Sequence, residues 1–472
     1  MRNPKLPALF LAILALPLLT SATRRRAVSG PETPLLLDVH RSFAVTDPAI
    51  LDGFSFERVM NTLVERSGVR GMTATRLFQQ WFDTQNPKPG LAEANAPHCD
   101  DFLLDGQPSF NGFTRRCPTP EGVLATSQPF VPPSFVPLAL INRFDLTAAD
   151  GSNCGEYRII FALTAKKSPL DKIHLIFEGV LPNPNLSAGL AGCRPVAQFW
   201  ADLSNVESIS ERRARLENFF FNGIPGFPPL VHPDHYGSAS GGSIRATHYT
   251  FNANPHVGPR FYQFHLEKNC DGDNCTLRMQ PDVLANVPVA RLFDGRNESP
   301  VAVRFRQEFI RHVQTLAVPD VNGFFMHIPR EFLVAEADVI QSALGYSVGF
   351  TTGLLSPAGQ QFNSAIRAEL KRIGSTLAPT EVIARAETQT CTGCHFVAAP
   401  IGDGMQFPSP SPLFQHVGEE FQEPGEAGPR YALSPAMRNV FLPHRMEILR
   451  RFLSSGAPPI HSNGVTIGGG RD

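Results

Sequence analysis

The chain has 472 residues, of which 42 are lysine or arginine and 43 are aspartate or glutamate, so its formal net charge is -1. Because positive charge is not in excess, the composition gives no electrostatic basis for binding nucleic acid or an anionic membrane surface. The length predicts two or three domains with ample core, and the 43 prolines predict many turns and long irregular connections.

The N-terminal residues predict an export signal. Two basic residues precede an apolar run over 6–19, and small residues follow that allow cleavage after Ala22. The run is shorter than the about 20 residues that a membrane-spanning helix needs. We therefore expect 1–22 to be a signal peptide and the mature chain to be extracytoplasmic, either periplasmic in a bacterium or secreted, with no integral membrane segment. The alternative is an uncleaved anchor, which the arginines at 24–26 favour.

Residues 34–375 predict an α+β domain with a central sheet. Apolar residues at three- and four-residue spacing indicate helices. These helices are predicted within 34–90 and at 205–221, 301–317 and 356–373. Short apolar runs bounded by turn residues predict strands, most of them buried. The runs are PLALINRFDL, GEYRIIFALT, KIHLIFEGVLP, SIRATHYTF and RFYQFHLEK.

Six cysteines precede the C-terminal region, and an exported chain is expected to hold them in disulfides. Six cysteines allow many connectivities, which the sequence alone does not distinguish. Nearest-neighbour pairing joins Cys99 with Cys117, Cys154 with Cys193, and Cys270 with Cys275. The last pair flanks the turn residues DGDN between two strand-like runs, which would place its cysteines across a hairpin. This loop lacks the remaining ligands of an EF-hand, so a turn is favoured over a calcium site.

Residues 387–400 read ETQTCTGCHFVAAP, which contains the pattern C-x-x-C-H. This pattern is typical of covalent attachment of a c-type haem, in which two thiols form thioethers and the imidazole binds iron. A zinc site would need a second pair of ligands, and the chain has no other C-x-x-C. A thioredoxin-like pair would need a βαβ context, which the Pro-rich flank does not offer. A plain disulfide remains the alternative.

The C-terminal residues 376–456 resemble c-type cytochromes, because helical patterns over 379–388 and 434–455 lie on either side of the motif. The resemblance implies a small all-α haem domain, followed by a flexible tail over 457–472. It also implies one covalently bound haem c per chain. The site residues that it implies are Cys391 and Cys394 as thioether anchors and His395 as the proximal iron ligand.

The sixth iron ligand is expected from the loop behind the motif. His416, in PLFQHVGEEF, is the first candidate, because the apolar residues around it could pack against the porphyrin. Met405, in GDGMQF, is the alternative. Met437, His444 and Met446 in the predicted final helix are further alternatives, as is an open iron site.

The upstream run LALINRFDLTAADGSNCGEYRIIFAL, with CRPVAQFWADL after it, resembles a group of uncharacterised exported bacterial proteins that end in one haem motif. The resemblance implies no activity. The run places four charged residues beside apolar strands, namely Arg143, Asp145, Glu156 and Arg158. Two interpretations are open: a functional cluster, or ion pairs that tie the edge of a sheet to its loops.

Five histidines in one stretch raise the question of a metal site. They are His232, His235, His248, His256 and His265. The first two form an H-x-x-H pattern in a Pro/Gly-rich loop and the others lie on separate segments, which disfavours a rigid ligand set. The chain has no G-x-S-x-G elbow and no P-loop, so no catalytic residue is assigned.

The sequence as a whole predicts an exported mono-haem c-type protein. Electron transfer is the expected role, because a covalently held haem with two axial ligands exchanges electrons without binding a substrate. Its partner would be an unidentified redox protein, and the large domain would recognise a partner or ligand. One alternative is a secreted binding or structural module whose C-x-x-C is a disulfide. The other is a haem enzyme with an open, polar iron site, such as a peroxidase.

Overall fold

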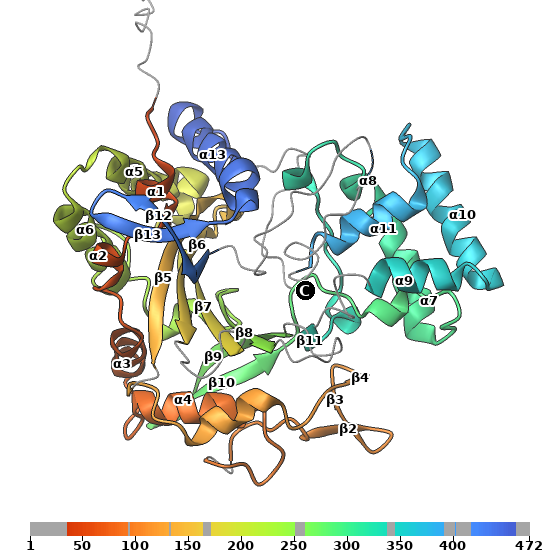
Figure 1. The fold of residues 1–472 in the computed structure, drawn as a ribbon, viewed down its shortest axis with the longest axis horizontal. Coiled ribbons are helices and arrows are strands. Elements are labelled where there is room, and N and C mark those ends of the chain that lie inside the picture. Colours follow the sequence, from red (N-terminus) through yellow and green to blue (C-terminus); the bar gives the residue numbers. More distant parts are fainter. Residues whose placement is uncertain are drawn as a thin grey trace, which may run out of the picture. The chain divides into compact units, whose positions relative to one another are not determined.

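The computed structural model describes residues 35–92, 95–131, 134–163, 171–250, 260–337, 345–390, 402 and 417–458. Residues Leu36–Asp472 cluster as one unit, whose described elements form a large antiparallel sheet with helices on both sides (Figure 1). The predicted α+β class with a central sheet is confirmed. The predicted signal peptide over 1–22 lies outside the described residues. Among the described residues, no helix is both long and apolar enough to cross a membrane.

The central sheet has eight strands, and all its pairings are antiparallel. Its order is β1-β5-β6-β7-β8-β9-β10, and β11 pairs with β9 beside this path. The strands are β1 (Ala44–Val45), β5 (Phe135–Arg143), β6 (Asn153–Leu163), β7 (Asp171–Pro182), β8 (Ser243–Thr250), β9 (Arg260–Asp271), β10 (Asn274–Asp282) and β11 (Glu336–Ala337). The five predicted runs correspond to β5 through β9, which are neighbours in the sheet in their sequence order.

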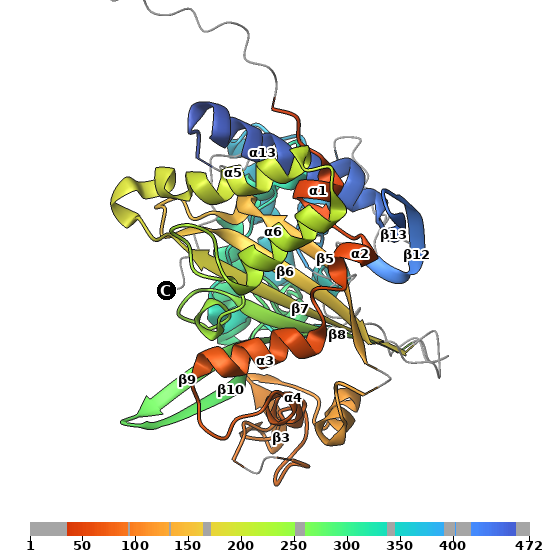
Figure 2. The same cartoon turned by 90° about the vertical axis from the view of Figure 1, so that its left-hand side faces the viewer.

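One face of the sheet is aromatic and is covered by four helices (Figure 2). These helices are α3 (Phe56–Ser67), α4 (Ala74–Asp83), α5 (Arg194–Asp202) and α6 (Ile209–Phe221). Phe161 of β6 meets Phe56 of α3 edge-on, with ring centroids 5.3 Å apart. Tyr157, also on β6, stacks on Trp200 of α5 at 5.4 Å. Such pairs contribute about 0.5–1.5 kcal/mol each beyond the area that they bury, so they fix the helices on this face.

Local sequence explains why α3 forms where it does. The side chain of Ser55 accepts a hydrogen bond from the backbone N–H of Arg58, which satisfies one of the free donors at the start of a helix. Gly68 ends the helix with a φ of 65°, a left-handed conformation that glycine adopts without steric cost. Between these caps, apolar side chains at helical spacing are buried. They are Phe56, Val59, Met60, Leu63 and Val64.

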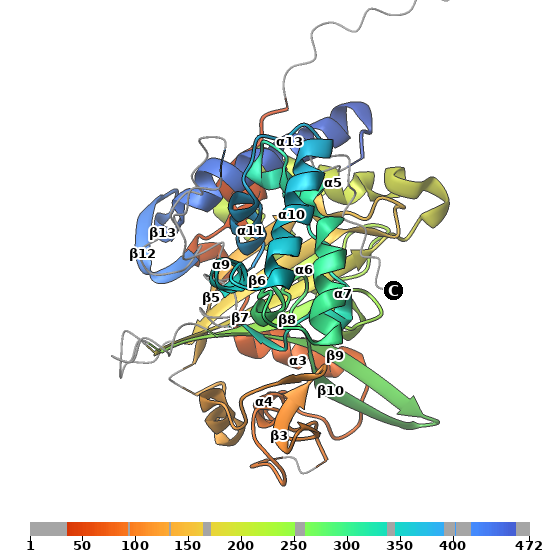
Figure 3. The ribbon, with the colours of Figure 1, turned by 90° about the vertical axis from the view of Figure 1, so that its right-hand side faces the viewer.

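A second group of helices lies on the opposite side of the sheet (Figure 3). They are α7 (Pro300–Ile310), α8 (Val313–Leu316), α9 (Gly345–Gly353), α10 (Pro357–Arg372) and α11 (Pro379–Glu387). They share an apolar cluster in which Phe293 stacks on Tyr346 with ring centroids 4.3 Å apart. The helix predicted at 301–317 is divided into α7 and α8, whereas those predicted at 356–373 and 379–388 are present as α10 and α11.

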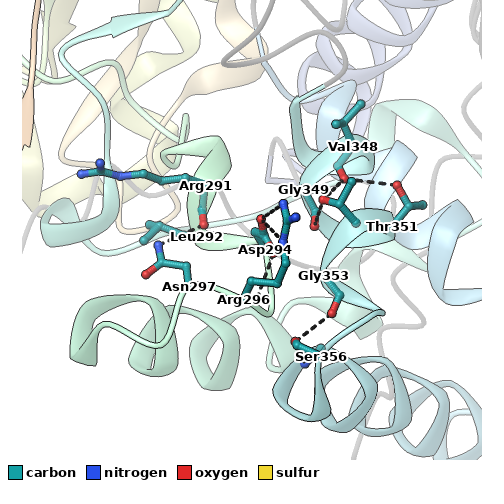
Figure 4. Close-up of polar contacts among 12 residues, drawn as sticks. Arg291, Leu292, Asp294, Arg296, Asn297, Val348, Gly349, Thr351, Gly353 and Ser356 are labelled. Carbon is teal, nitrogen blue, oxygen red and sulfur yellow. Dashed lines mark hydrogen bonds and ion pairs between the residues drawn. The ribbon is translucent and has the colours of Figure 1, made fainter.

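Three glycines let the backbone approach itself closely in this helical layer, and Figure 4 shows one of them, Gly353, beside Ser356. A β-carbon on Gly295 would overlap the α-carbon of Gly359, and a β-carbon on Gly359 would overlap the carbonyl oxygen of Gly353. The hydroxyl of Ser356 donates to that same carbonyl at 2.8 Å, which holds the turn between α9 and α10. Because the closest overlapping atoms belong to the backbone, they cannot move aside as a flexible side chain can.

Residues 417–458 form a hairpin followed by the final helix. The elements are β12 (Val417–Gly425), β13 (Gly428–Leu433), a π-helical turn (Met437–Phe441) and α13 (Leu442–Ser455). Phe452 of α13 packs on Phe144, with ring centroids 4.8 Å apart, and Arg194 of α5 donates to the carbonyl of Leu453 at 2.6 Å. The predicted all-α cytochrome c-like domain over 376–456 is not confirmed, because a hairpin lies between its two helices.

Three disulfides join the six cysteines in the pairing that nearest neighbours predicted. They are Cys99–Cys117, Cys154–Cys193 and Cys270–Cys275. Cys270 and Cys275 are direct cross-strand partners at the end of the β9–β10 hairpin, as the turn residues between them indicated. The chain has eight cysteines, so the two that remain are Cys391 and Cys394.

We expect Gly359→Ala to lower the free energy of unfolding by about 1–3 kcal/mol, because the added methyl group must push the α9–α10 turn apart. Chemical denaturation followed by circular dichroism measures this change. Ser364→Ala on the exposed side of α10 is the matched control and should change stability by less than about 0.5 kcal/mol. Equal stability of the two variants would show that the glycine contact is not tight.

Candidate functional site

Cys391, Cys394, His395, Met405 and His416 all lie outside the described residues. The residues on either side of them are well anchored. Thr390, directly before the motif, has a relative exposure of 1 %, and Val417, where β12 begins, has 6 %. Since α11 belongs to the helical layer and β12 begins the hairpin, the haem motif falls in the connection between these two parts of the chain.

The pairing of the cysteines fits the covalently bound haem that the C-x-x-C-H motif implies. Covalent haem attachment needs two thiols that form no disulfide elsewhere, with an imidazole beside the second. The three disulfides use every other cysteine of the chain, which leaves Cys391 and Cys394 for this role. His395 follows directly and supplies the imidazole.

Glu387, at the end of α11, caps the first turn of α9. Its carboxylate accepts hydrogen bonds from the backbone N–H of Ser347 at 2.8 Å and from the Ser347 hydroxyl at 2.7 Å. Burial raises the pKa of Glu387 to about 7, against the lowering effect of these hydrogen bonds. Cys391 follows four residues later, so its α-carbon lies within about 14 Å of that of Glu387 whatever path the chain takes.

The four charged residues that the sequence singled out lie together. The guanidinium of Arg143 binds the carboxylate of Asp145 through both nitrogens, at 2.8 to 3.2 Å. Arg158 binds Glu156 at 2.5 Å, and Glu156 is the direct cross-strand partner of Arg143. Alternation along β6 puts these side chains on the face opposite to the aromatic residues. They are ion pairs, as one of the two interpretations held. Asp145 is buried, and the other three residues are half-buried.

Glu178 of β7 joins this cluster, which the sequence did not reveal. It lies across from Arg158, whose nitrogen is 3.1 Å away, and it also binds Arg245 of β8 and the hydroxyl of Ser243. Burial alone would raise the pKa of Glu178, but the two guanidiniums and the hydrogen bonds lower it to about 2. The carboxylate is therefore held ionised in a buried site.

Arg445 of α13 reaches the same cluster from outside the sheet. Its side chain is 11 % exposed, and its Nε lies 3.7 Å from the carboxylate of Asp145. Burial, together with the nearby Arg143, lowers the pKa of Arg445 to about 9, although Asp145 acts to raise it. The cluster thus receives its fourth guanidinium from a segment far away in the sequence.

A second ion-pair group ties the hairpin to the other end of β7. Lys172 lies 2.8 Å from Glu420 and 3.4 Å from Glu419, and His174 lies 3.7 Å from Glu419. Burial opposes ionisation of Glu419, but the hydrogen bond to His174 leads the effects that lower its pKa to about 2. The residues that directly follow His416 are therefore fixed above the charged face of the sheet.

The histidines do not assemble into a metal site among the described residues, where no group of three His, Cys, Asp or Glu is placed to hold an ion. His248 binds Glu121 at 2.7 Å, and His265 binds Asp282 at 2.6 Å. Burial lowers the pKa of His235 to about 4, although its hydrogen bond with the carbonyl of Leu230 acts to raise it. His256 lies outside the described residues.

Three alternative iron ligands lie in the final helical segment. Met437 is buried in the π-helical turn, and His444 and Met446 are half-buried in α13. Met446 directly follows Arg445, so this part of α13 lies beside the charged cluster.

A sequence pattern could have indicated some of the charged residues that the sequence analysis did not single out. In KIHLIFEGV the polar residues Lys172, His174 and Glu178 recur at even spacing, which marks one face of a strand as polar. Nothing in the local sequence links them to Arg445, because that contact spans most of the chain.

We expect Glu178→Gln to lower the free energy of unfolding at pH 7 by about 3 kcal/mol, because it removes a buried carboxylate that two half-buried guanidiniums share. The depressed pKa of Glu178 contributes stability that is complete above the unfolded value of about 4.3 and is lost as pH falls towards 2. Denaturation at several pH values should therefore show a shallower acid loss in the variant. Glu57→Gln on the exposed side of α3 is the control, and identical acid profiles for the two variants would contradict the role of Glu178.

Comparison with known proteins found no match: no protein-family model, no curated protein and no solved structure matches the chain. The resemblance to c-type cytochromes therefore stays a prediction, carried by Cys391, Cys394 and His395.

Proposed function

We propose that the chain is an exported mono-haem c-type protein that transfers electrons. The observation that carries this proposal is the C-x-x-C-H pattern, whose two cysteines are the only ones that the three disulfides do not use. Cys391 and Cys394 would form the thioethers, and His395 would bind the iron. The haem would be held in the connection between α11 and β12, within the proposed cytochrome c-like region 376–456.

The residues of the chain have distinct roles in this proposal. His416 is the first candidate for the second axial position and Met405 the alternative, and either one would close the iron to substrates. A haem with two protein ligands supplies one-electron exchange without a bound substrate. The sheet with its covering helices gives a rigid frame. Such a frame limits the movement of protein atoms when the iron gains or loses an electron. The large domain would contact the redox partner, an unidentified protein outside the cytoplasm.

We expect the protein, produced in a host that matures c-type cytochromes, to keep its haem after denaturation. Covalent thioethers survive conditions that release a haem held only by iron ligands. Haem staining of a denaturing gel measures this directly. Cys394→Ala should remove most of the stain, because one of the two anchors is then missing.

The matched control is the double variant Cys270→Ala/Cys275→Ala, which removes a disulfide at a hairpin tip and should retain full haem stain. Unstained wild-type protein, with a mass that shows a Cys391–Cys394 disulfide, would overturn the proposal in favour of a secreted binding module. Stained protein whose ferric iron is high-spin and takes up cyanide readily would instead indicate the haem enzyme.

A further inference from the structure

A pocket of about 180 Å³ opens at the β10 edge of the central sheet. It lies between the start of α4, the turn that joins α3 to α4, and the end of β10 nearest the hairpin tip. Figure 2 shows this β9–β10 hairpin extending beyond α3 and α4. An engineered apolar cavity of about 150 Å³ is large enough to bind benzene, so a ligand of similar size would fit here.

The outer edge of β10 presents backbone N–H groups to the pocket. The side-chain amide of Gln80 donates to the carbonyl of Met279 at 3.4 Å and accepts the N–H of Met279 at 2.9 Å. Met279 therefore turns its backbone groups towards α4 and away from β9. Because the β9–β10 register is continuous, alternation turns the N–H groups of Leu277 and Cys275 the same way. Both residues line the pocket, so these N–H groups can donate to a ligand there.

The charged side chains among the described residues that line the pocket are all arginines, namely Arg70, Arg76 and Arg278. Arg70 and Arg278 form no ion pair with a described residue. Arg278 lies across from Glu267 in the strand register, but the carboxylate of Glu267 accepts the backbone N–H of Ser238 at 2.8 Å instead. Like charges around one pocket repel one another, and an anion bound among them relieves this repulsion.

Apolar side chains form another part of the pocket lining. They are Val69, Met72, Ala96 and Leu277, of which all but the half-buried Met72 are buried. An inorganic anion such as phosphate would leave this apolar part unused. A carboxylate attached to a short apolar group would use both parts, as ligands of pockets with mainly apolar walls and a few polar groups do. The guanidinium fork also matches the two oxygens of a carboxylate.

The walls of the pocket are held in place by contacts within the chain. The disulfide Cys270–Cys275 joins β9 to β10 beside the pocket, and the Gln80 amide fixes β10 to α4. The hydroxyl of Thr73 accepts the backbone N–H of Arg76 at 3.1 Å, which fixes the first turn of α4. A site whose backbone is already ordered loses less conformational entropy when a ligand binds.

We propose that this pocket binds a small organic anion, a monocarboxylate with a branched apolar group of about four carbons. Arg70 and Arg278 would bind the carboxylate together with the N–H of Leu277, and Val69 and Met72 would contact the apolar group. The site does not rest on the proposed electron transfer, because its lining includes no residue of the haem motif. It would give the large domain a ligand of its own.

The test measures the melting temperature of the full mature chain as sodium isovalerate is added at constant ionic strength. A saturating rise is expected, and its concentration dependence gives an apparent dissociation constant. Arg70→Gln and Arg278→Gln should each raise this constant by about tenfold or more, because each removes charge-assisted hydrogen bonds to the carboxylate. Arg367→Gln, on the exposed side of α10, is the matched control and should bind as wild type does.

Two further probes define the class of ligand. Isoamyl alcohol has the same apolar group without the charge and should not raise the melting temperature. Sodium phosphate at the same ionic strength should stabilise the protein less than isovalerate does. Equal stabilisation by phosphate or by the alcohol would overturn the assignment to a carboxylate with an apolar group. No rise with isovalerate, or one dissociation constant in wild type and all three variants, would overturn the site itself.

Discussion

The ion-pair cluster on one face of the central sheet is the constraint on which the rest of the structure depends. The opposite face packs aromatic rings against four helices and needs no further partner. On the charged face, Glu178 binds two guanidiniums, and Asp145 is shared by Arg143 and Arg445. Removing such groups from water is costly unless each finds a counter-charge, so the elements that supply counter-charges must stay in place.

The C-terminal elements reach this face of the sheet from two directions. The hairpin brings Glu419 and Glu420 to Lys172 at one end of β7, and α13 brings Arg445 to the other end of the face. The connection that carries the haem motif runs between α11 and this hairpin.

Much of the fold could be predicted from local patterns. The strands β5 to β9 and the helices α3, α6, α10 and α11 could be predicted from the spacing of apolar residues and from capping residues. The disulfides join cysteines that are nearest neighbours in the sequence. The hairpin of β12 and β13 was missed, because its strands are polar and Pro/Gly-rich, which is typical of loops. The cluster was only half found: Arg143, Asp145, Glu156 and Arg158 are close in sequence, whereas Arg445 reaches them through tertiary packing that no local pattern encodes.

A crystal structure of the haem-matured protein would test the central claim most directly. The expected result is a porphyrin bonded to Cys391 and Cys394, with His395 on the iron. A Cys391–Cys394 disulfide without a porphyrin would contradict it.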